Sequence, residues 1–283
     1  MKIKQILITR FNIVSSYSYK LPFDAEADEE YLERRFRLFE EYTFPSVIAS
    51  ENKDFTWIVL FSEKTPEKFK KRIKMLERKS MLFRPLFLDG REEGRRLTKE
   101  YCLEISALHH EICNRVILSY DADCFLISRI DNDDAISKKY MSFLYNYVIN
   151  RRIEKECALY FDKGFQYDTF YRLLGQLQDK NNHFYSILSM RKNILIPIFI
   201  DHGSARKEIY TINIDTDPMW IEITHGGNLG NKCVITPKTV VNNRMYLRDF
   251  ELKDPPRIHS PLLSFFLSCI LSIKLYTTRV FHS

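Results

Sequence analysis

Strand-like apolar runs alternate with segments of helical periodicity along the first half of this chain. The strand-like runs cover residues 6–12, 55–61, 84–88 and 124–128, and the helix-like segments cover residues 29–42, 69–76 and 95–114. Strands that alternate with helices favour a parallel sheet with helices on its faces. Ligands of such sheets bind beyond the carboxyl ends of the strands, where polar residues follow each run here. The sequence therefore predicts an α/β fold built on a Rossmann-like sheet.

The pattern changes near residue 135. Short apolar segments alternate with polar loops over residues 136–255, which is typical of a smaller mixed α/β region. A length of 283 residues suits one large core, so we expect residues 1–135 and 136–255 to be two halves of one domain. Residues 256–283 then form an apolar C-terminal tail.

Glycine is scarce, with 8 residues in the chain, and neither GxGxxG nor GxxxxGKS/T occurs. A chain of this kind must neutralise phosphates with cations rather than wrap them in backbone amides. The formal net charge of +6 fits an anionic substrate. No stripe of basic residues with interleaved aromatics indicates nucleic-acid binding, so we expect no nucleic-acid partner.

Three carboxylates, Asp131, Asp133 and Asp134, follow the fourth strand-like run. Such a cluster is costly unless positive charge lies beside it, although a solvated acidic turn is an alternative. An EF-hand calcium loop is excluded, because Ile136 stands where that loop needs glycine. A hard cation, Mg²⁺ or Mn²⁺, held by carboxylates and substrate phosphates fits the cluster. It would neutralise a leaving diphosphate.

A second acidic pair, Asp121 and Asp123, also follows an apolar run at residues 116–118. Either cluster can hold the metal on spacing alone. The pair at 121–123 lacks an adjacent arginine, whereas Arg129 adjoins the first cluster, so the pair is the weaker candidate.

His225 ends an apolar run and leads into Gly226 and Gly227. Glycines let a backbone approach a ligand, so this imidazole can reach a metal. A structural role is the alternative, because a lone histidine is more often structural.

Composition gives expectations for the cellular compartment and for the C-terminal tail. The six cysteines form no CxxC pair and no signal-peptide pattern is present, so we expect free thiols and a cytoplasmic protein. Residues 262–273 are nearly all apolar, yet a bilayer span needs about 20 residues. Packing of the tail on the core and peripheral contact with the inner face of the membrane both remain open.

Several blocks together point to a known family. They are TRFN at 9–12, YLERRF at 31–36, FTW at 55–57, SEKTP at 62–66, RIDNDDA at 129–135 and PMWIEITHGGN at 218–228. Together they resemble the putative rhamnosyltransferase family of bacterial GT-A-like glycosyltransferases, over roughly residues 5–250. The resemblance implies a nucleotide-sugar-binding half at 1–135, a DxD-type metal site and an acceptor-binding half at 136–255.

The resemblance also implies a reaction. A sugar, with rhamnose as the first candidate, would move from a nucleoside diphosphate donor to a hydroxyl of a glycan or lipid-linked acceptor, with a metal ion. Asp131 would meet the ribose or the donor sugar. Asp133, with Asp134 in reserve, would ligate Mg²⁺ or Mn²⁺, and His225 would complete the coordination.

The nucleotide pocket would be lined by Thr9, Arg10 and Asn12, together with Arg129. Many GT-A enzymes carry an aspartate after the second strand to meet the nucleobase. This chain has Glu63 in that loop, which puts base recognition there in doubt.

The general base and the acceptor site lie further along the chain. We expect Asp217 to be the base because it stands just before the strand of Trp220, whose ring can stack on a sugar. Asp201 and Glu222 are alternatives for the base. A nucleotidyltransferase, or a non-catalytic carbohydrate-binding protein on the same fold, would be the alternative functions.

Overall fold

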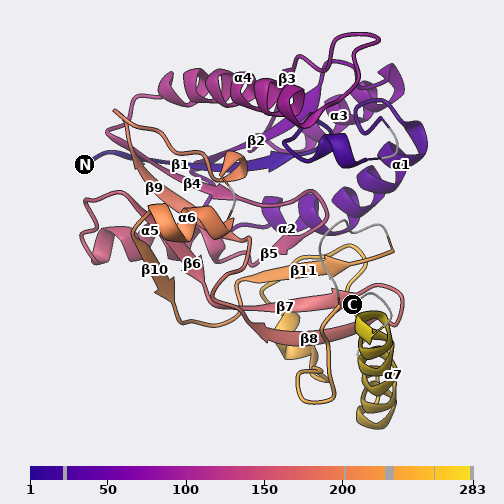
Figure 1. Cartoon of the computed structure of the whole chain (residues 1–283). Helices are drawn as coiled ribbons and strands as arrows, with labels where there is room; N and C mark the ends of the chain where they lie inside the picture. The colour runs from indigo at the N-terminus through magenta and orange to yellow at the C-terminus, as the bar shows by residue number, and fades with distance from the viewer. Residues whose placement is uncertain (22–23, 201, 227–232, 258, 281–283) are drawn as a thin grey trace.

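A computed structural model describes residues 1–21, 24–200, 202–226, 233–257 and 259–280 (Figure 1). Seven strands form one sheet in the order β10-β6-β9-β4-β1-β2-β3, and four form a smaller sheet in the order β5-β11-β7-β8. In Figure 1 the smaller sheet lies below the larger one, and α7 lies beside it. The α/β class predicted from the sequence is confirmed.

The elements have the following bounds. The larger sheet contains β1 (Ile3–Arg10), β2 (Phe55–Ser62), β3 (Phe83–Leu88), β4 (Cys124–Arg129), β6 (Cys157–Phe161), β9 (Tyr185–Met190) and β10 (Thr211–Ile214). The smaller sheet contains β5 (Ala135–Ile136), β7 (Lys163–Asp168), β8 (Leu173–Gln178) and β11 (Trp220–Thr224). The helices are α1 (Glu29–Leu38), α2 (Phe44–Ile48), α3 (Glu67–Lys79), α4 (Lys99–Leu118), α5 (Tyr140–Asn150), α6 (His202–Glu208) and α7 (Pro261–Val280).

Strand direction departs from the sequence-based prediction in one place. Strands β3, β2, β1 and β4 are parallel neighbours, as expected for strands joined by helices. Strand β9, however, pairs antiparallel with both β4 and β6. Its amino end therefore lies beside the carboxyl end of β4. Because β6, β9 and β10 come from residues 136–255, the two expected halves share one sheet.

Aromatic packing fixes helix α1 against the larger sheet. Asp28 caps the helix by accepting a hydrogen bond from the Tyr31 N–H, at 2.8 Å. Phe36, on the buried face of α1, stacks on Phe69 of α3 with ring centroids 5.2 Å apart, and lies 4.4 Å from Phe11. The helix continues through a π-turn at Phe39–Thr43 into α2. This packing sets where the arginines of α1 lie.

Trp220 joins the two sheets. Its indole N–H donates to the Phe161 carbonyl at the end of β6, at 2.9 Å, and its ring stacks on Phe184 at 4.8 Å. The indole covers Gly164 of β7, where an added Cβ would lie 2.1 Å from the ring. Glycine is therefore required at this close approach.

Helix α7 packs against β8 through one face. Leu267 and Leu271 contact the cluster formed with Leu173 and Ile235. The opposite face is open, since Leu262 keeps 80% of its surface exposed. Among the described residues, no helix has the length and apolar character that a membrane crossing requires.

Candidate functional site

The acidic turn at residues 131–134 connects the two sheets. Strand β4 ends at Arg129, and the Ile130 N–H donates to the Ile8 carbonyl of β1. After the turn, β5 pairs with β11 of the smaller sheet. The Asn132 amide donates to the Phe11 carbonyl at 2.9 Å, which holds the turn against the loop after β1. The carboxylates thus stand at the carboxyl ends of β4 and β1, where α/β sheets bind ligands.

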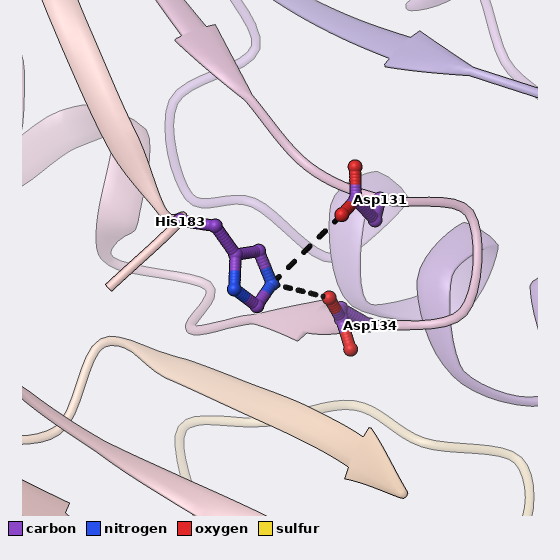
Figure 2. Close-up of side chains that lie close together, drawn as sticks. All are labelled: Asp131, Asp134 and His183. Atoms are coloured by element: carbon purple, nitrogen blue, oxygen red, sulfur yellow. Dashed lines mark hydrogen bonds and ion pairs between the residues drawn. The ribbon is translucent and has the colours of Figure 1, made fainter. Parts of the chain in front are cut away.

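Two carboxylates of the turn converge on one imidazole (Figure 2). Asp134 accepts the Ile223 N–H on Oδ1, and its Oδ2 lies 2.9 Å from His183 Nε2. Asp131 accepts from Arg129 on Oδ1 at 2.8 Å, and its Oδ2 lies 4.0 Å from the same nitrogen. Each carboxylate is therefore anchored by one oxygen and directs the other at His183.

These three side chains form a possible metal-binding group. One ligand atom from each of Asp131, Asp134 and His183 lies within 4.8 Å of the other two. Divalent cations bind carboxylate oxygens and imidazole nitrogens at about 2.0–2.2 Å, so a cation between the three atoms needs small side-chain adjustments only. The anchored oxygens would keep both carboxylates in place. We call Asp131, Asp134 and His183 the carboxylate–histidine group.

The protonation of this group follows from burial. Burial raises the pKa of Asp134 to about 7, against the hydrogen bond from His183, and the charge of Asp133 adds to the rise. Burial alone would lower the pKa of His183, but the hydrogen bond and charge of Asp134 raise it to about 9. Between about pH 7 and pH 9 the two form a charged pair, and a bound cation would displace the proton of His183.

The other two carboxylates of the turn also have positive neighbours. Burial would raise the pKa of Asp131, but the charges of Arg129, His183 and Arg10 hold it well below its usual range. Asp133 Oδ2 lies 2.9 Å from Arg35 Nη1 and 3.0 Å from His225 Nε2.

A pocket of about 720 Å³ opens beside the carboxylate–histidine group. Its charged end is lined by Arg10 and Arg129 with Asp131 and His183. Its other end is apolar, with residues from α4 and from the segment 195–200. A second pocket, of about 560 Å³, is lined by His225 and Gly226 and by Arg34 and Arg37 of α1. We call these the first and second pockets.

A family model described as "Putative rhamnosyl transferase" matches residues 5–236. The chain belongs to this family. The match covers most of the chain and includes the acidic turn, His183 and His225. A comparison with curated proteins finds no match.

Several solved structures match large parts of this chain. S. aureus TarS matches with a TM-score of 0.40 and 10% identity, over 79% of this chain and 37% of that one. S. aureus TarS 1-349 in complex with UDP-GlcNAc matches with a TM-score of 0.37 and 11% identity, over 84% and 62%. A putative nucleotide-diphospho-sugar transferase from Desulfovibrio desulfuricans G20 matches with a TM-score of 0.36 and 10% identity, over 80% and 83%.

The chain thus spans less than two thirds of either TarS chain. The matches have TM-scores of 0.36 to 0.40, and the fold class rests on the strand order and pairing described above. At this level of similarity they do not bear on substrate or activity.

Some residues expected in the nucleotide pocket of this rhamnosyl transferase family member lie elsewhere. Arg10 and Arg129 line the first pocket. Thr9 is fully buried and accepts a hydrogen bond from the Trp57 indole. Asn12 is also buried, and its amide donates to the Glu26 carbonyl and to Thr65. Thr9 joins strands β1 and β2, Asn12 joins the loops that follow them, and neither side chain lines the pocket.

Glu63 also lies outside the first pocket. Its side chain is 55% exposed, and a carboxylate oxygen lies 4.0 Å from Lys70 Nζ. A role in base recognition stays a prediction without support from the geometry.

The two residues expected to serve the acceptor are not available beside the carboxylates: Asp217 lies at the other end of β11, and Trp220 is covered. Asp217 is exposed and precedes β11, whereas His225 follows that strand, so the two occupy its opposite ends. Trp220 is 1% exposed, with Phe184 stacked on its ring. A covered indole has no face to offer a sugar, so Trp220 acts in packing. Asp201 lies outside the described residues.

Sequence reasoning missed two residues of the site. His183 directly precedes Phe184 and the apolar run of β9, and it reaches Asp134 because β9 runs antiparallel to β4. Strand direction was the signal that the pattern lacked. Arg35 lies on α1 next to Phe36, at the margin of the buried face, where helical periodicity alone does not separate a buried arginine from an exposed one. Its side chain is 13% exposed.

Proposed function

We propose that this protein is a metal-dependent glycosyltransferase that uses a nucleoside diphosphate sugar donor. The observation that carries the proposal is the carboxylate–histidine group at the charged end of the first pocket. A cation held there, Mg²⁺ or Mn²⁺, would supply Lewis-acid stabilisation of the diphosphate as it leaves.

Two arginines suit this pocket to a diphosphate. Arg129 is paired with Asp131 through Nη2. Among the described residues, Arg10 has no ion-pair partner and the buried Nε of Arg129 has no hydrogen-bond acceptor. Burial and the charge of Arg129 both lower the pKa of Arg10. Two neighbouring guanidinium groups against one carboxylate leave net positive charge, which an anionic ligand would neutralise. The apolar end of the pocket would receive the nucleoside.

The acceptor hydroxyl would approach from the second pocket. His225 lines that pocket and contacts Asp133, so the acidic turn separates the two pockets. Glu222 is one of the carboxyl groups considered for the base, and burial raises its pKa. The charges of His183 and Asp133 also act on this pKa, which indicates that Glu222 lies near both residues. We therefore assign the base to Glu222 rather than Asp217. Glu222→Gln should lower kcat and leave the donor KM unchanged, and an unchanged kcat would rule out Glu222 as the base.

The sugar is tested by a panel of nucleotide sugars. The purified protein is incubated with Mn²⁺ and with nucleoside diphosphate rhamnoses, glucoses and N-acetylhexosamines, and released nucleoside diphosphate is measured. We expect release with a rhamnose donor in the presence of a glycan or glycolipid acceptor. Pyrophosphate formed from a sugar 1-phosphate and a nucleoside triphosphate would instead identify a nucleotidyltransferase. No turnover with any donor would leave a carbohydrate-binding protein.

The exposed face of α7 supports peripheral membrane contact at the cytoplasmic side, where a lipid-linked acceptor would lie. Phe265 and Phe266 are 55% and 60% exposed, next to Leu262 at 80%. An amphipathic helix binds a membrane surface through such an apolar face. Replacing both phenylalanines by serine should abolish binding to phosphatidylglycerol vesicles at low salt. The control is Met81→Ser, at a residue that is 86% exposed elsewhere. Vesicle binding that survives the double change, or is absent in the wild type, would remove the membrane from the account.

A further inference from the structure

Two adjoining cavities lie at the amino ends of β7 and β11, away from the acidic turn. One measures about 500 Å³ and the other about 520 Å³, and both are lined by Lys163, Gln176 and Tyr246. Because they share these three residues, they form one continuous groove across the end of the smaller sheet. We call it the amino-end groove.

Tyr246 gives this groove an aromatic surface. The side chain is 48% exposed, although its ring packs edge-on against Phe165 with centroids 6.1 Å apart. The contact holds the ring in place while leaving part of it open to a ligand. A fixed, partly exposed aromatic ring is suited to pack against the apolar C–H face of a sugar.

Three planar polar side chains also line the groove. Asp217, Gln176 and Asn242 are exposed and offer carboxylate and amide groups, which hydrogen-bond hydroxyl groups as acceptors and donors. An aromatic ring flanked by such groups matches the alternating apolar and hydroxylated faces of an oligosaccharide.

The charges of the groove balance. Lys163 pairs with Asp215 at 2.6 Å, and Lys238 and Asp217 add one charge of each sign. A groove with two cations and two carboxylates has no net attraction for a polyanion. This balance favours a neutral glycan over an acidic polymer or a nucleic acid.

The groove lies too far from the acidic turn to take part in the chemistry. Strands β7 and β11 separate it from His225, and strands of five to six residues span about 17–20 Å. A sugar in the groove would belong to a part of a glycan chain remote from the reacting hydroxyl.

We propose that the amino-end groove is a second, non-catalytic binding site for a neutral oligosaccharide, which holds the acceptor glycan while its end is modified. The identity of the ligand rests on the proposed glycosyl transfer. Asp217, expected from the sequence to be the base, would bind sugar hydroxyls here.

The test uses an array of neutral and acidic oligosaccharides probed with the full-length protein, without donor or metal. Wild type should bind at least one neutral oligosaccharide. Tyr246→Ala and Asp217→Asn should each weaken that binding by roughly tenfold, whereas Tyr246→Phe should keep it. Tyr145→Ala is the matched control, since this tyrosine is exposed on α5 and lines none of the cavities. Thermal unfolding of each variant checks that the fold is kept.

Three results would overturn the inference: no neutral oligosaccharide bound by wild type, binding that Tyr246→Ala leaves unchanged, or a preference for acidic oligosaccharides. The array reads binding without turnover. A failure of glycosyl transfer would appear in the nucleotide-sugar assay instead, so the two proposals fail separately. Asp134→Asn should bind the array like wild type, because Asp134 lies at the other end of the smaller sheet.

Discussion

Acidic residues flank both ends of strand β4, and the two ends differ in what surrounds them. Asp121 and Asp123 precede the strand, are exposed, and accept hydrogen bonds from the side chain and backbone N–H of Lys2. Asp131 and Asp134 follow the strand, where Arg129 and His183 face them. The first pair is satisfied by the N-terminal segment. The second group is enclosed and directs free oxygens at an imidazole.

This difference shows what makes a carboxylate cluster suitable for chemistry. The spacing of the aspartates in the sequence is similar at the two ends of β4. The carboxyl end, however, lies beside β1, β9 and β11, which bring hydrogen-bonding and positively charged groups from distant segments of the chain. Near the amino end of β4, Lys2 and Arg191 lie close to Asp121. Position at the carboxyl end of a parallel strand therefore separates the two clusters.

Substitution of Asp134 tests the difference between the two ends of β4 most strongly. Asp134→Asn keeps an oxygen for the Ile223 N–H but weakens a ligand of the carboxylate–histidine group, so nucleoside diphosphate release should fall at least about 100-fold. Asp123→Asn is the control at the other end of β4 and should leave the rate unchanged. Loss of activity in Asp123→Asn with retention in Asp134→Asn would mean that the metal lies at residues 121–123.

Stability of the metal-free protein gives the next comparison. Asp133→Ala should lower the free energy of unfolding by about 3 kcal/mol, because it leaves the buried Arg35 without its partner. Charge repulsion within the turn would predict the opposite sign. Urea unfolding in EDTA measures the change, and Asp121→Ala should have no measurable effect because its pair with Lys2 is exposed. A more stable Asp133→Ala protein would show that repulsion dominates.

The pH dependence of Mn²⁺ binding sharpens the same contrast. The pKa of His183 is raised to about 9, so at lower pH each Mn²⁺ must displace its proton. Affinity should therefore rise about tenfold per pH unit between pH 7 and 9 and level off above. A site made only of exposed carboxylates, which titrate near pH 4, would give a constant affinity over this range. Calorimetric titration at several pH values distinguishes the two.

Part of the fold could be predicted because strands such as β2 and β4 are apolar over most of their length. Strand β2 is buried at every position, and the periodicity of α1 placed Leu32 and Phe36 correctly. The direction of β9 could not be predicted, because an apolar run reads the same in either orientation.

The unpredicted direction of β9 also limited the prediction of the site residues. Arg10, Arg129 and the acidic turn were expected in the site because each stands at or directly after the carboxyl end of a strand of the parallel set. His183 was missed because it precedes its strand, and only an antiparallel β9 brings it to Asp134. Trp220 was expected to bind the acceptor because an aromatic residue at the start of a strand can be exposed. Gly164 has no side chain, so the indole packs against β7 at this point and Trp220 is buried.

We propose that His183, with Asp131 and Asp134, holds the metal ion, and this assignment can be tested directly. Pulsed electron paramagnetic resonance of bound Mn²⁺ detects an imidazole nitrogen in its coordination sphere. We expect this nitrogen signal in the wild type, its loss in His183→Ala, and its retention in His225→Ala, whose imidazole contacts Asp133 instead. A signal that disappears in His225→Ala and persists in His183→Ala would contradict the account and restore the ligand set predicted from the sequence.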